Sequence, residues 1–183
     1  MLPARGGIVI RMIVSMIAAI GKNNALGKDN TLLWNMPADM KHFRDTTRGH
    51  TVIMGRKTFE SLPNGPLPKR ENIVVTHDTS YHRQGIVVMH SLDEALRYAA
   101  LDQGKHFEEK QEETEIFIIG GGELYTQGMA RTHKLYITRI DDSPEADTHF
   151  PPIGPEWKEV SREEHSPDTE HKFGYAFLVY KKA

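Results

Sequence analysis

The sequence predicts a single α/β domain, built on a mostly parallel sheet with an antiparallel C-terminal edge and flanking helices. Short apolar, β-branched runs alternate with amphipathic stretches along most of the chain. This alternation is the order that gives a parallel sheet covered by helices. Two strand-like segments near the C-terminus follow one another without a helix, which indicates an antiparallel pair. The length of 183 residues suits one domain with one core.

The first strand is expected over residues 12–20, which are apolar and rich in β-branched side chains. Arg5 followed by the apolar run could be read as a signal peptide, but Arg11 divides that run. The remaining stretch is also too short to cross a bilayer. We therefore interpret residues 1–11 as an N-terminal extension or remnant, and residues 12–183 as the domain.

The elements that follow are marked by turn residues and by changes in apolar periodicity. Asn23, Asn24, Asn30 and Gly27 predict a loop over residues 21–36 that could act as a lid. The expected elements after it are a helix over 37–47, a strand over 51–55, a helix over 56–62, strands over 72–76 and 86–89, a helix over 91–101, strands over 115–119 and 135–140, and an antiparallel pair near 157–165 and 173–181. The acidic stretch 103–114 is expected to be a solvated loop.

Composition limits the classes of partner. The net charge is -2 with both signs spread along the chain, so neither nucleic acid nor a membrane surface is expected and the partner should be a small molecule. The absence of Cys excludes disulfides and thiolate sites and is compatible with the cytoplasm. The 10 His show no close ligand pair, which favours scattered histidines over a metal site. Size and charge give a monomer as the expectation.

Asp39 is the most informative single residue. Pro37 suits a first helical turn, and the spacing of Met36, Met40 and Phe43 places Asp39 beside the apolar stripe of that helix. An acid at this position also offsets the helix dipole without any further function. With Trp34 nearby, however, the apolar residues could form a flat pocket in which one carboxylate anchors a ring with adjacent N–H donors.

Two strand-to-helix junctions could bind an anion. Gly55-Arg56-Lys57-Thr58 follows one buried strand and Gly120-Gly121-Gly122 follows another. Such junctions meet at the carboxyl edge of a parallel sheet, where free N–H groups and basic side chains attract phosphate. Each motif alone is also explained by a tight turn or a solvated basic pair. Together they suggest a long phosphate-bearing ligand, although no G-x-G-x-x-G fingerprint is present.

Several motifs occur in a fixed order along the chain. They are Met16-Ile17-Ala18-Ala19, Leu33-Trp34-Asn35-Met36-Pro37-Ala38-Asp39, Val52-Ile53-Met54-Gly55-Arg56-Lys57-Thr58-Phe59-Glu60-Ser61-Leu62, Leu67-Pro68 with Arg70, Ile118-Ile119-Gly120-Gly121-Gly122-Glu123-Leu124-Tyr125, Leu135-Tyr136-Ile137-Thr138 and Asp147-Thr148-His149-Phe150-Pro151. Over residues 12–182 the chain thereby resembles dihydrofolate reductase of the bacterial type. The resemblance implies an eight-stranded sheet and the NADPH-dependent reduction of 7,8-dihydrofolate to tetrahydrofolate.

The resemblance also implies roles for individual residues. Asp39 would bind the pteridine through N3 and the 2-amino group, with Thr138 hydrogen-bonded beside it, and Arg70 would pair with the glutamate α-carboxylate. Antifolate inhibitors would enter the same pocket. The other residues expected around the substrate are Ile17, Ala18, Met40, Phe43, Leu62, Leu67 and Ile119.

For NADPH, the resemblance implies three contact regions. Ala19, Leu26 and Gly27 would flank the nicotinamide, Thr58 with Gly120, Gly121 and Gly122 the pyrophosphate, and Arg56 with Thr76 and His77 the 2′-phosphate. Gly55, Lys57, Glu123, Leu124 and Tyr125 complete the expected cofactor site. In this family Gly120 and Gly121 are joined by a cis peptide bond.

The chain departs from the family pattern at a few positions. Leu32 stands in the lid where Met is frequent, and Leu33 replaces Pro before Trp34. Glu123 stands where some members carry Arg, and Asp78 follows the expected 2′-phosphate residues. Both acids should weaken phosphate binding, but Arg56 and Lys57 still favour NADPH over NADH.

The expected catalytic residues are Asp39, Trp34 and Leu32. Asp39 is the obvious ionisable group of the pterin pocket, yet the family geometry places it far from N5, so water is the expected proton donor. Ionised Asp39 would stabilise the protonated pterin while the lid excludes other water. The indole N–H of Trp34 could hold that water, or the side chain could be only a core aromatic. Asp147 is interpreted as a turn residue, although the resemblance suggests a contact with the lid.

Two other functions remain open from the sequence. A related reductase of pyrimidine-riboside intermediates has the same general fold, and a non-catalytic pterin- or nucleotide-binding module is also possible. Asp39 together with Arg70 favours dihydrofolate reductase, because a ribose-phosphate substrate has little use for an arginine that binds a carboxylate at the end of an apolar trough.

Overall fold

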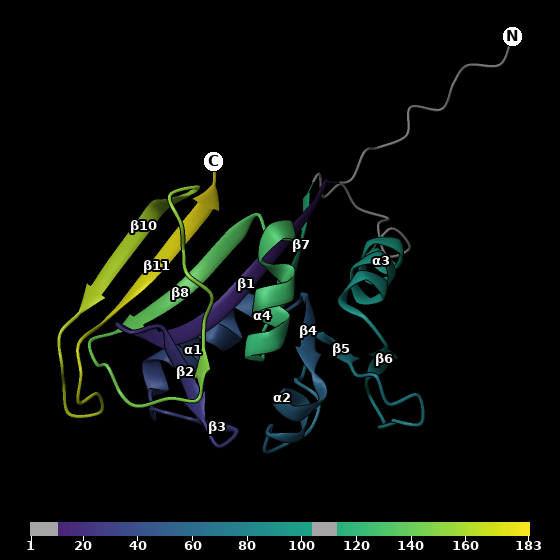
Figure 1. The fold of residues 1–183 in the computed structure, drawn as a ribbon, viewed down its shortest axis with the longest axis horizontal. Coiled ribbons are helices and arrows are strands. Elements are labelled where there is room, and N and C mark those ends of the chain that lie inside the picture. The colour runs from purple at the N-terminus through teal and green to yellow at the C-terminus, as the bar shows by residue number, and fades with distance from the viewer. Residues whose placement is uncertain (1–10, 104–112) are drawn as a thin grey trace, which may run out of the picture.

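A twisted eight-stranded sheet forms the centre of the computed structural model, which describes residues 11–103 and 113–183 (Figure 1). The strand order is β10-β11-β8-β1-β7-β4-β5-β6. Its strands are β1 (Arg11–Gly21), β4 (Thr51–Gly55), β5 (Glu71–Val75), β6 (Val87–Met89), β7 (Glu113–Ile118), β8 (Lys134–Ile140), β10 (Trp157–His165) and β11 (Tyr175–Lys182). Pairing is parallel from β8 through β1 to β6, and antiparallel between β8, β11 and β10. The predicted fold class is confirmed.

Helices cover both faces of this sheet. α3 (Leu92–Gln103) and α4 (Gly122–Gly128), which the 3-10 turn η1 (Met129–Arg131) follows, pack on one face. α1 (Pro37–Thr47) and α2 (Arg56–Glu60) belong to the other face, where Phe43 and Phe59 contact the sheet. Because side chains alternate along a strand, β1 contributes Met16 to the first core and Ile17 to the second.

The predicted lid contains more regular structure than the sequence indicated. A second, three-stranded sheet joins β3 (Thr31–Leu32), β2 (Ala25–Lys28) and β9 (Thr148–His149) in that order. Because β9 comes from a distant part of the chain, this pairing leaves no local sequence pattern. The expected loop over residues 21–36 therefore contains two antiparallel strands, β2 and β3, and β2 also pairs with β9.

The C-terminal hairpin ends the large sheet on one side (Figure 1). Its register shifts between Glu159 and Ser161, so β10 carries a bulge. Most side chains of β10 are exposed, and Arg162 forms ion pairs with Glu159 and Glu164. The opposite edge is β6, which has 3 residues.

Two boundaries differ from the sequence expectation. β1 begins at Arg11, which forms an ion pair of 3.6 Å with Glu113 of the neighbouring strand, so Arg11 belongs to the sheet. The expected solvated loop over 103–114 lies mostly outside the described residues, and β7 already begins at Glu113. Within the described ranges, no helix is long and apolar enough to cross a membrane.

Candidate active site

Asp39 lies in the first turn of α1, next to Thr138 of the large sheet. Pro37 occupies the start of this helix, where its missing N–H costs nothing. The Asp39 Oδ1 accepts a 2.6 Å hydrogen bond from the hydroxyl of Thr138 on β8. Thr138 is buried, so this bond joins the helix to the neighbouring strand from inside the protein. The expected pairing of the two residues is present.

The environment of Asp39 holds its pKa above the usual carboxyl range. Burial is the main cause, because it disfavours the charged form, and it outweighs the opposing effects of the Thr138 hydrogen bond and of His42. Perturbed carboxyl groups of this kind collect at functional sites. A carboxylate that is poorly solvated is prepared to bind a cationic or N–H-bearing ring.

Several of the predicted substrate residues pack in one apolar cluster on the α1 face of the sheet. Ile17 lies in the core of this face, and four partly buried side chains pack against that core: Phe43, Leu62, Leu67 and Ile119. The side chain of Ala18 packs in the core of the opposite face. Met40 is 59% exposed. Phe43 of this cluster and Asp39 lie on the same helix, one turn apart.

Arg70 lies near Phe43 of this apolar cluster. Its Nε donates to the carbonyl of Pro68 at 3.0 Å, and another guanidinium nitrogen donates to Thr47 Oγ1 at 3.0 Å. Its guanidinium also lies 5.9 Å from the centre of the Phe43 ring. These contacts orient the planar guanidinium of a partly exposed arginine, which is a geometry that suits a carboxylate.

The lid residues have mixed positions. Leu32 is 82% exposed, so most of its side chain faces solvent. The indole N–H of Trp34 donates to Asp142 Oδ2 at 3.0 Å. This hydrogen bond uses the N–H group that the sequence suggested could hold a water. Asp147 Oδ2 accepts a 2.8 Å hydrogen bond from the backbone amide of Asp29. Asp147 is therefore a contact between the β9 segment and the lid, in contrast to our interpretation of a purely local turn.

The two glycine junctions meet at the same sheet edge. The Gly55 amide donates to the Gly120 carbonyl at 2.9 Å, and the bond between Gly120 and Gly121 is a cis peptide, as the resemblance implied. A Cβ at Gly121 would lie 3.3 Å from Thr58 Oγ1, and one at Gly122 only 2.6 Å from Thr148 Cγ2. The glycines thus permit a close approach between the backbone of this junction and the side chains of Thr58 and Thr148.

Basic and acidic side chains lie together beside α2. Arg56 is 3.7 Å from Asp78, so the acid that follows the predicted 2′-phosphate residues does reach this guanidinium. Thr76 Oγ1 accepts from the Asp78 amide at 3.2 Å, and His77 and Lys57 are exposed. An anion at this position must therefore compete with the Asp78 carboxylate for Arg56.

The remaining predicted cofactor residues are partly buried or belong to the core. Ala19, Leu26 and Gly27 are half-buried, whereas Leu124 lies in the core. The Tyr125 hydroxyl is buried and donates to the Ile17 carbonyl at 2.7 Å, and burial followed by the charge of Asp39 raises its pKa. Glu123 is exposed and accepts a 3.1 Å hydrogen bond from Gln127.

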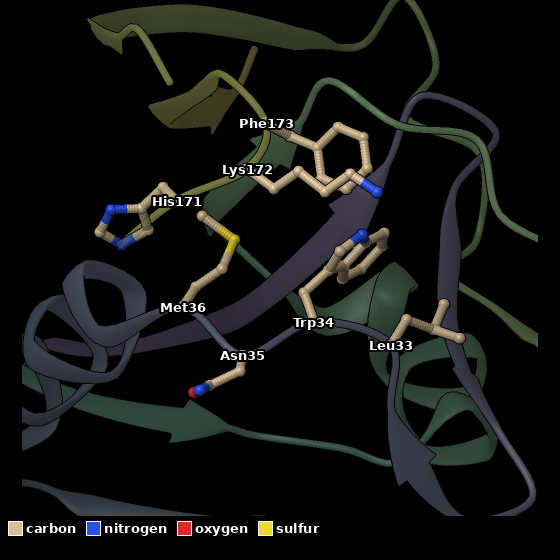
Figure 2. A pocket seen from close by; sticks show the side chains of 7 residues that line it. All are labelled: Leu33, Trp34, Asn35, Met36, His171, Lys172 and Phe173. Carbon is tan, nitrogen blue, oxygen red and sulfur yellow. The ribbon is translucent and has the colours of Figure 1, made fainter. Parts of the chain in front are cut away.

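Sequence reasoning missed several residues around the start of α1. A pocket of about 210 Å³ lies between the end of the lid and the loop that joins β10 to β11, and Figure 2 shows the side chains that line it: Leu33, Trp34, Asn35, Met36, His171, Lys172 and Phe173. His42 stacks on Phe177 at 4.1 Å between ring centres. Only the pair Asp168 and His171, three residues apart, gave a local hint of these contacts. In the described parts of the chain, no three His, Asp or Glu side chains gather as a metal site.

Comparison with known proteins places this geometry in one family. A family model described as dihydrofolate reductase matches residues 13–182. The dihydrofolate reductase type 3 of Salmonella typhimurium is 40% identical over 172 residues, which cover 93% of this chain and 99% of that protein. The dihydrofolate reductase of Bacillus subtilis (strain 168) is 40% identical over 171 residues, with 93% and 95% covered.

A solved structure agrees with these sequence matches. The dihydrofolate reductase of Enterococcus faecalis complexed with NADP(H) and RAB-propyl superposes with a TM-score of 0.80 at 30% identity, covering 93% of this chain and 96% of that one. The fold, the order of the motifs and the sequence matches lead to one conclusion: this chain belongs to the dihydrofolate reductase family.

Proposed function

We propose that this chain reduces 7,8-dihydrofolate to tetrahydrofolate with NADPH, and that Asp39 anchors the pterin ring. Membership of the family makes the chain an NADPH-dependent oxidoreductase. The observation that supports the residue assignment is the carboxylate of Asp39, held by Thr138 on the face of the sheet where Ile17 and Phe43 form an apolar cluster. A pterin presents adjacent N–H donors to such a carboxylate and a flat ring to such an apolar surface.

The glycine junctions fit the cofactor. Gly55, Gly121 and Gly122 would approach the pyrophosphate with their backbone, and the Thr58 hydroxyl lies beside Gly121. Arg56 and Lys57 provide the positive charge that a 2′-phosphate requires. When bound, NADPH supplies the hydride that reduces C6 of the pterin. The protein's contribution is to hold the two rings in register and to keep water away from them.

Asp39 acts by electrostatics in this proposal. The ionised carboxylate stabilises the protonated pterin in a poorly solvated pocket, and a water molecule delivers the proton to N5. Burial raises the pKa of Asp39, and a bound cationic ring would oppose this effect by favouring the ionised carboxyl. Trp34 is held by its hydrogen bond to Asp142, and Leu32 lies on the exposed surface of the lid.

Arg70 gives the proposal its substrate class. Its guanidinium, 5.9 Å from the centre of the Phe43 ring, would pair with the glutamate α-carboxylate of the folate, and Phe43 and Leu67 would contact the benzoyl ring. Antifolate inhibitors would bind at the same place. A pyrimidine-riboside substrate would use neither the apolar cluster nor Arg70, so that alternative is not favoured.

We also propose that the chain from Arg11 onward forms one catalytic domain, which acts as a monomer in the cytoplasm. The compact α/β arrangement and the mixed surface charge support this assembly state.

The proposed function is tested by absorbance at 340 nm with purified protein, dihydrofolate and NADPH. The expected result is a decrease that depends on dihydrofolate, is faster with NADPH than with NADH, and is strongly reduced in Asp39→Asn. Binding of NADPH without turnover would instead indicate a binding module.

A further inference from the structure

The N-terminus of α1 has no cap of its own. Met36 is the N-cap residue and makes no side-chain hydrogen bond to the helix, and Pro37 has no N–H. The next amide, that of Ala38, donates to Nε2 of His171 at 3.2 Å. Figure 2 shows the His171 ring close to Met36, where the helix begins. A histidine from the β10–β11 loop thus takes the place of the usual Ser, Thr, Asp or Asn cap.

His171 is itself held firmly by Asp168. Asp168 Oδ1 accepts from the His171 amide at 2.8 Å and lies 2.8 Å from His171 Nδ1. The Asp168 amide in turn donates to the His171 carbonyl at 2.9 Å. The ring is 5% exposed and packs against Tyr175, with 5.0 Å between ring centres. This arrangement is a fixed turn that presents one ring nitrogen to the helix.

The hydrogen bonds define which nitrogen carries the proton. A carboxylate accepts only, so Nδ1 donates to Asp168, whose pKa is lowered by that bond and by the backbone amides. Nε2 is then the acceptor that the Ala38 amide needs. Asp168 therefore selects the tautomer of His171 that can cap α1.

We propose that His171 is a positioning residue for Asp39, holding the first turn of α1 so that the Asp39 carboxylate stays in register with Thr138. The inference rests on the proposed function only for its effect on turnover. Asp39 directly follows Ala38 in the chain, so the first turn is fixed at two points, by His171 from the loop and by Thr138 from β8. Without the hydrogen bond to His171, only the hydrogen bond from Thr138 to Asp39 remains of these two.

The expected consequences follow from this double attachment. With the Ala38 amide unpaired, the first turn frays and the bond from Thr138 to Asp39 lengthens. Since that bond lowers the pKa of Asp39, its weakening shifts the titration of Asp39 to higher pH. The ionisable groups coupled to Asp39 are His42 on α1, Tyr125 on α4 and Tyr175 on β11. Around these lie further acids, and the substitutions below leave all of them in place: Asp45, Glu163, Asp168 and Glu170.

The test uses three variants of the whole chain. His171→Phe keeps a planar ring and removes the acceptor, while His171→Gln places an amide oxygen where Nε2 lies. Lys172→Met is the matched control, because this neighbour lines the same pocket while its ammonium group lies over the Phe173 ring, 5.2 Å from the ring centre. Each variant is examined without ligands by ¹³C NMR titration of the Asp39 carboxyl and by hydrogen exchange of the Ala38 amide.

The expected results separate positioning from simple stability. In His171→Phe the Asp39 midpoint moves to higher pH, Ala38 exchanges about tenfold faster, and KM for dihydrofolate rises about three- to tenfold, as for loss of a helix cap. KM for NADPH stays within about twofold, because the cofactor residues lie on other elements. His171→Gln restores most of each value, and Lys172→Met resembles the parent.

Two results would overturn the inference. One is a His171→Phe protein with the parent's Asp39 titration and Ala38 exchange. The other is a lowered Tm in that variant with an unchanged titration, which would make His171 a packing residue only. If the parent protein itself lacks turnover, the proposed function fails, but the two ligand-free measurements still decide the role of His171.

Discussion

Thr138 on β8 and Asp39 on α1 are joined by a 2.6 Å hydrogen bond from hydroxyl to carboxylate. Burial raises the pKa of Asp39, and this bond is the largest opposing influence. Thr138 therefore keeps a poorly solvated carboxyl group available in its ionised form. The catalytic pocket depends on a balance between these two effects.

Replacing Thr138 by Val should disturb that balance at constant side-chain size. We expect the Asp39 titration to move to higher pH and dihydrofolate to bind about tenfold more weakly at pH 7, because a hydrogen bond to a charged group contributes ~1.5–3 kcal/mol. Fluorescence quenching measures the binding. Thr138→Ser keeps the hydroxyl and is the control, and equal affinity of the Val variant and the parent would contradict the prediction.

Asp39→Asn should stabilise the ligand-free protein at neutral pH while reducing hydride transfer about 100-fold, the scale of one lost electrostatic contact. A raised folded-state pKa means that the native state binds the proton more tightly than the unfolded state. The contribution of Asp39 is therefore most favourable below the ordinary carboxyl pKa of 3.8 and is lost as pH rises through the folded pKa. Urea unfolding should show the Asn variant to be more stable at pH 7, with the difference shrinking toward pH 4. A destabilised Asn variant at pH 7 would refute this reading.

Asp78→Asn should strengthen the preference for NADPH over NADH. Asp78 lies 3.7 Å from Arg56, so it competes with a 2′-phosphate for the guanidinium. Because both side chains are well exposed, we expect only a modest gain, about two- to fivefold in the ratio of kcat/KM values. Glu123→Gln is the comparison. The Glu123 carboxylate already accepts a hydrogen bond from Gln127, so this substitution should change the ratio less. An unchanged ratio in Asp78→Asn would show that the carboxylate does not reach the phosphate.

Gly122→Ala should weaken NADPH binding, and Thr148→Ser should restore it. The new Cβ would lie 2.6 Å from Thr148 Cγ2, whereas its next contacts are at 3.7 Å and beyond. Serine lacks that methyl group and retains the hydroxyl that bonds to Asp147. We expect a cost of about 1–3 kcal/mol in the single variant, as for other overpacked sites. Isothermal titration with NADPH of the parent, the two single variants and the double variant gives the coupling free energy between Gly122→Ala and Thr148→Ser. Strictly additive effects on the binding free energy would exclude the proposed clash.

Asp147→Ala should loosen the lid without unfolding the domain. Asp147 accepts from the Asp29 amide at 2.8 Å, and that bond is the first cause of its lowered pKa. The contact is thus present at neutral pH and is lost as pH falls through this depressed pKa. We expect single-turnover hydride transfer to slow about three- to tenfold, in keeping with one lost hydrogen bond, while Tm stays nearly constant. Asp147→Asn retains an acceptor oxygen, so it should remain closer to the parent.

The sequence predicted the parts of the site that depend on local pattern and chain order. Helical periodicity placed Asp39 beside the apolar stripe of α1, and strand-to-helix order placed the two glycine junctions at one sheet edge. Both inferences need only neighbouring residues and the rule that parallel strands end together. The number of strands came from the family resemblance, and their order in the sheet was seen only in the structure.

The missed contacts join residues that are far apart in the chain. Trp34 and Asp142 are separated by 108 positions, and Ala38 and His171 by 133. The lid was expected as a loop because β2 finds its partner β9 only through the tertiary fold. Side-chain orientation also escaped the sequence, since the exposure of Leu32 and Met40 depends on which direction each side chain takes from its backbone.

The two outer strands of the large sheet have a consequence for association between molecules. β10 has a bulge between Glu159 and Ser161 and three consecutive charged residues, Arg162, Glu163 and Glu164, and β6 has 3 residues. An edge that is irregular, charged or very short is a poor template for a strand from another chain. The sheet can therefore keep open edges without inviting edge-to-edge aggregation at high protein concentration.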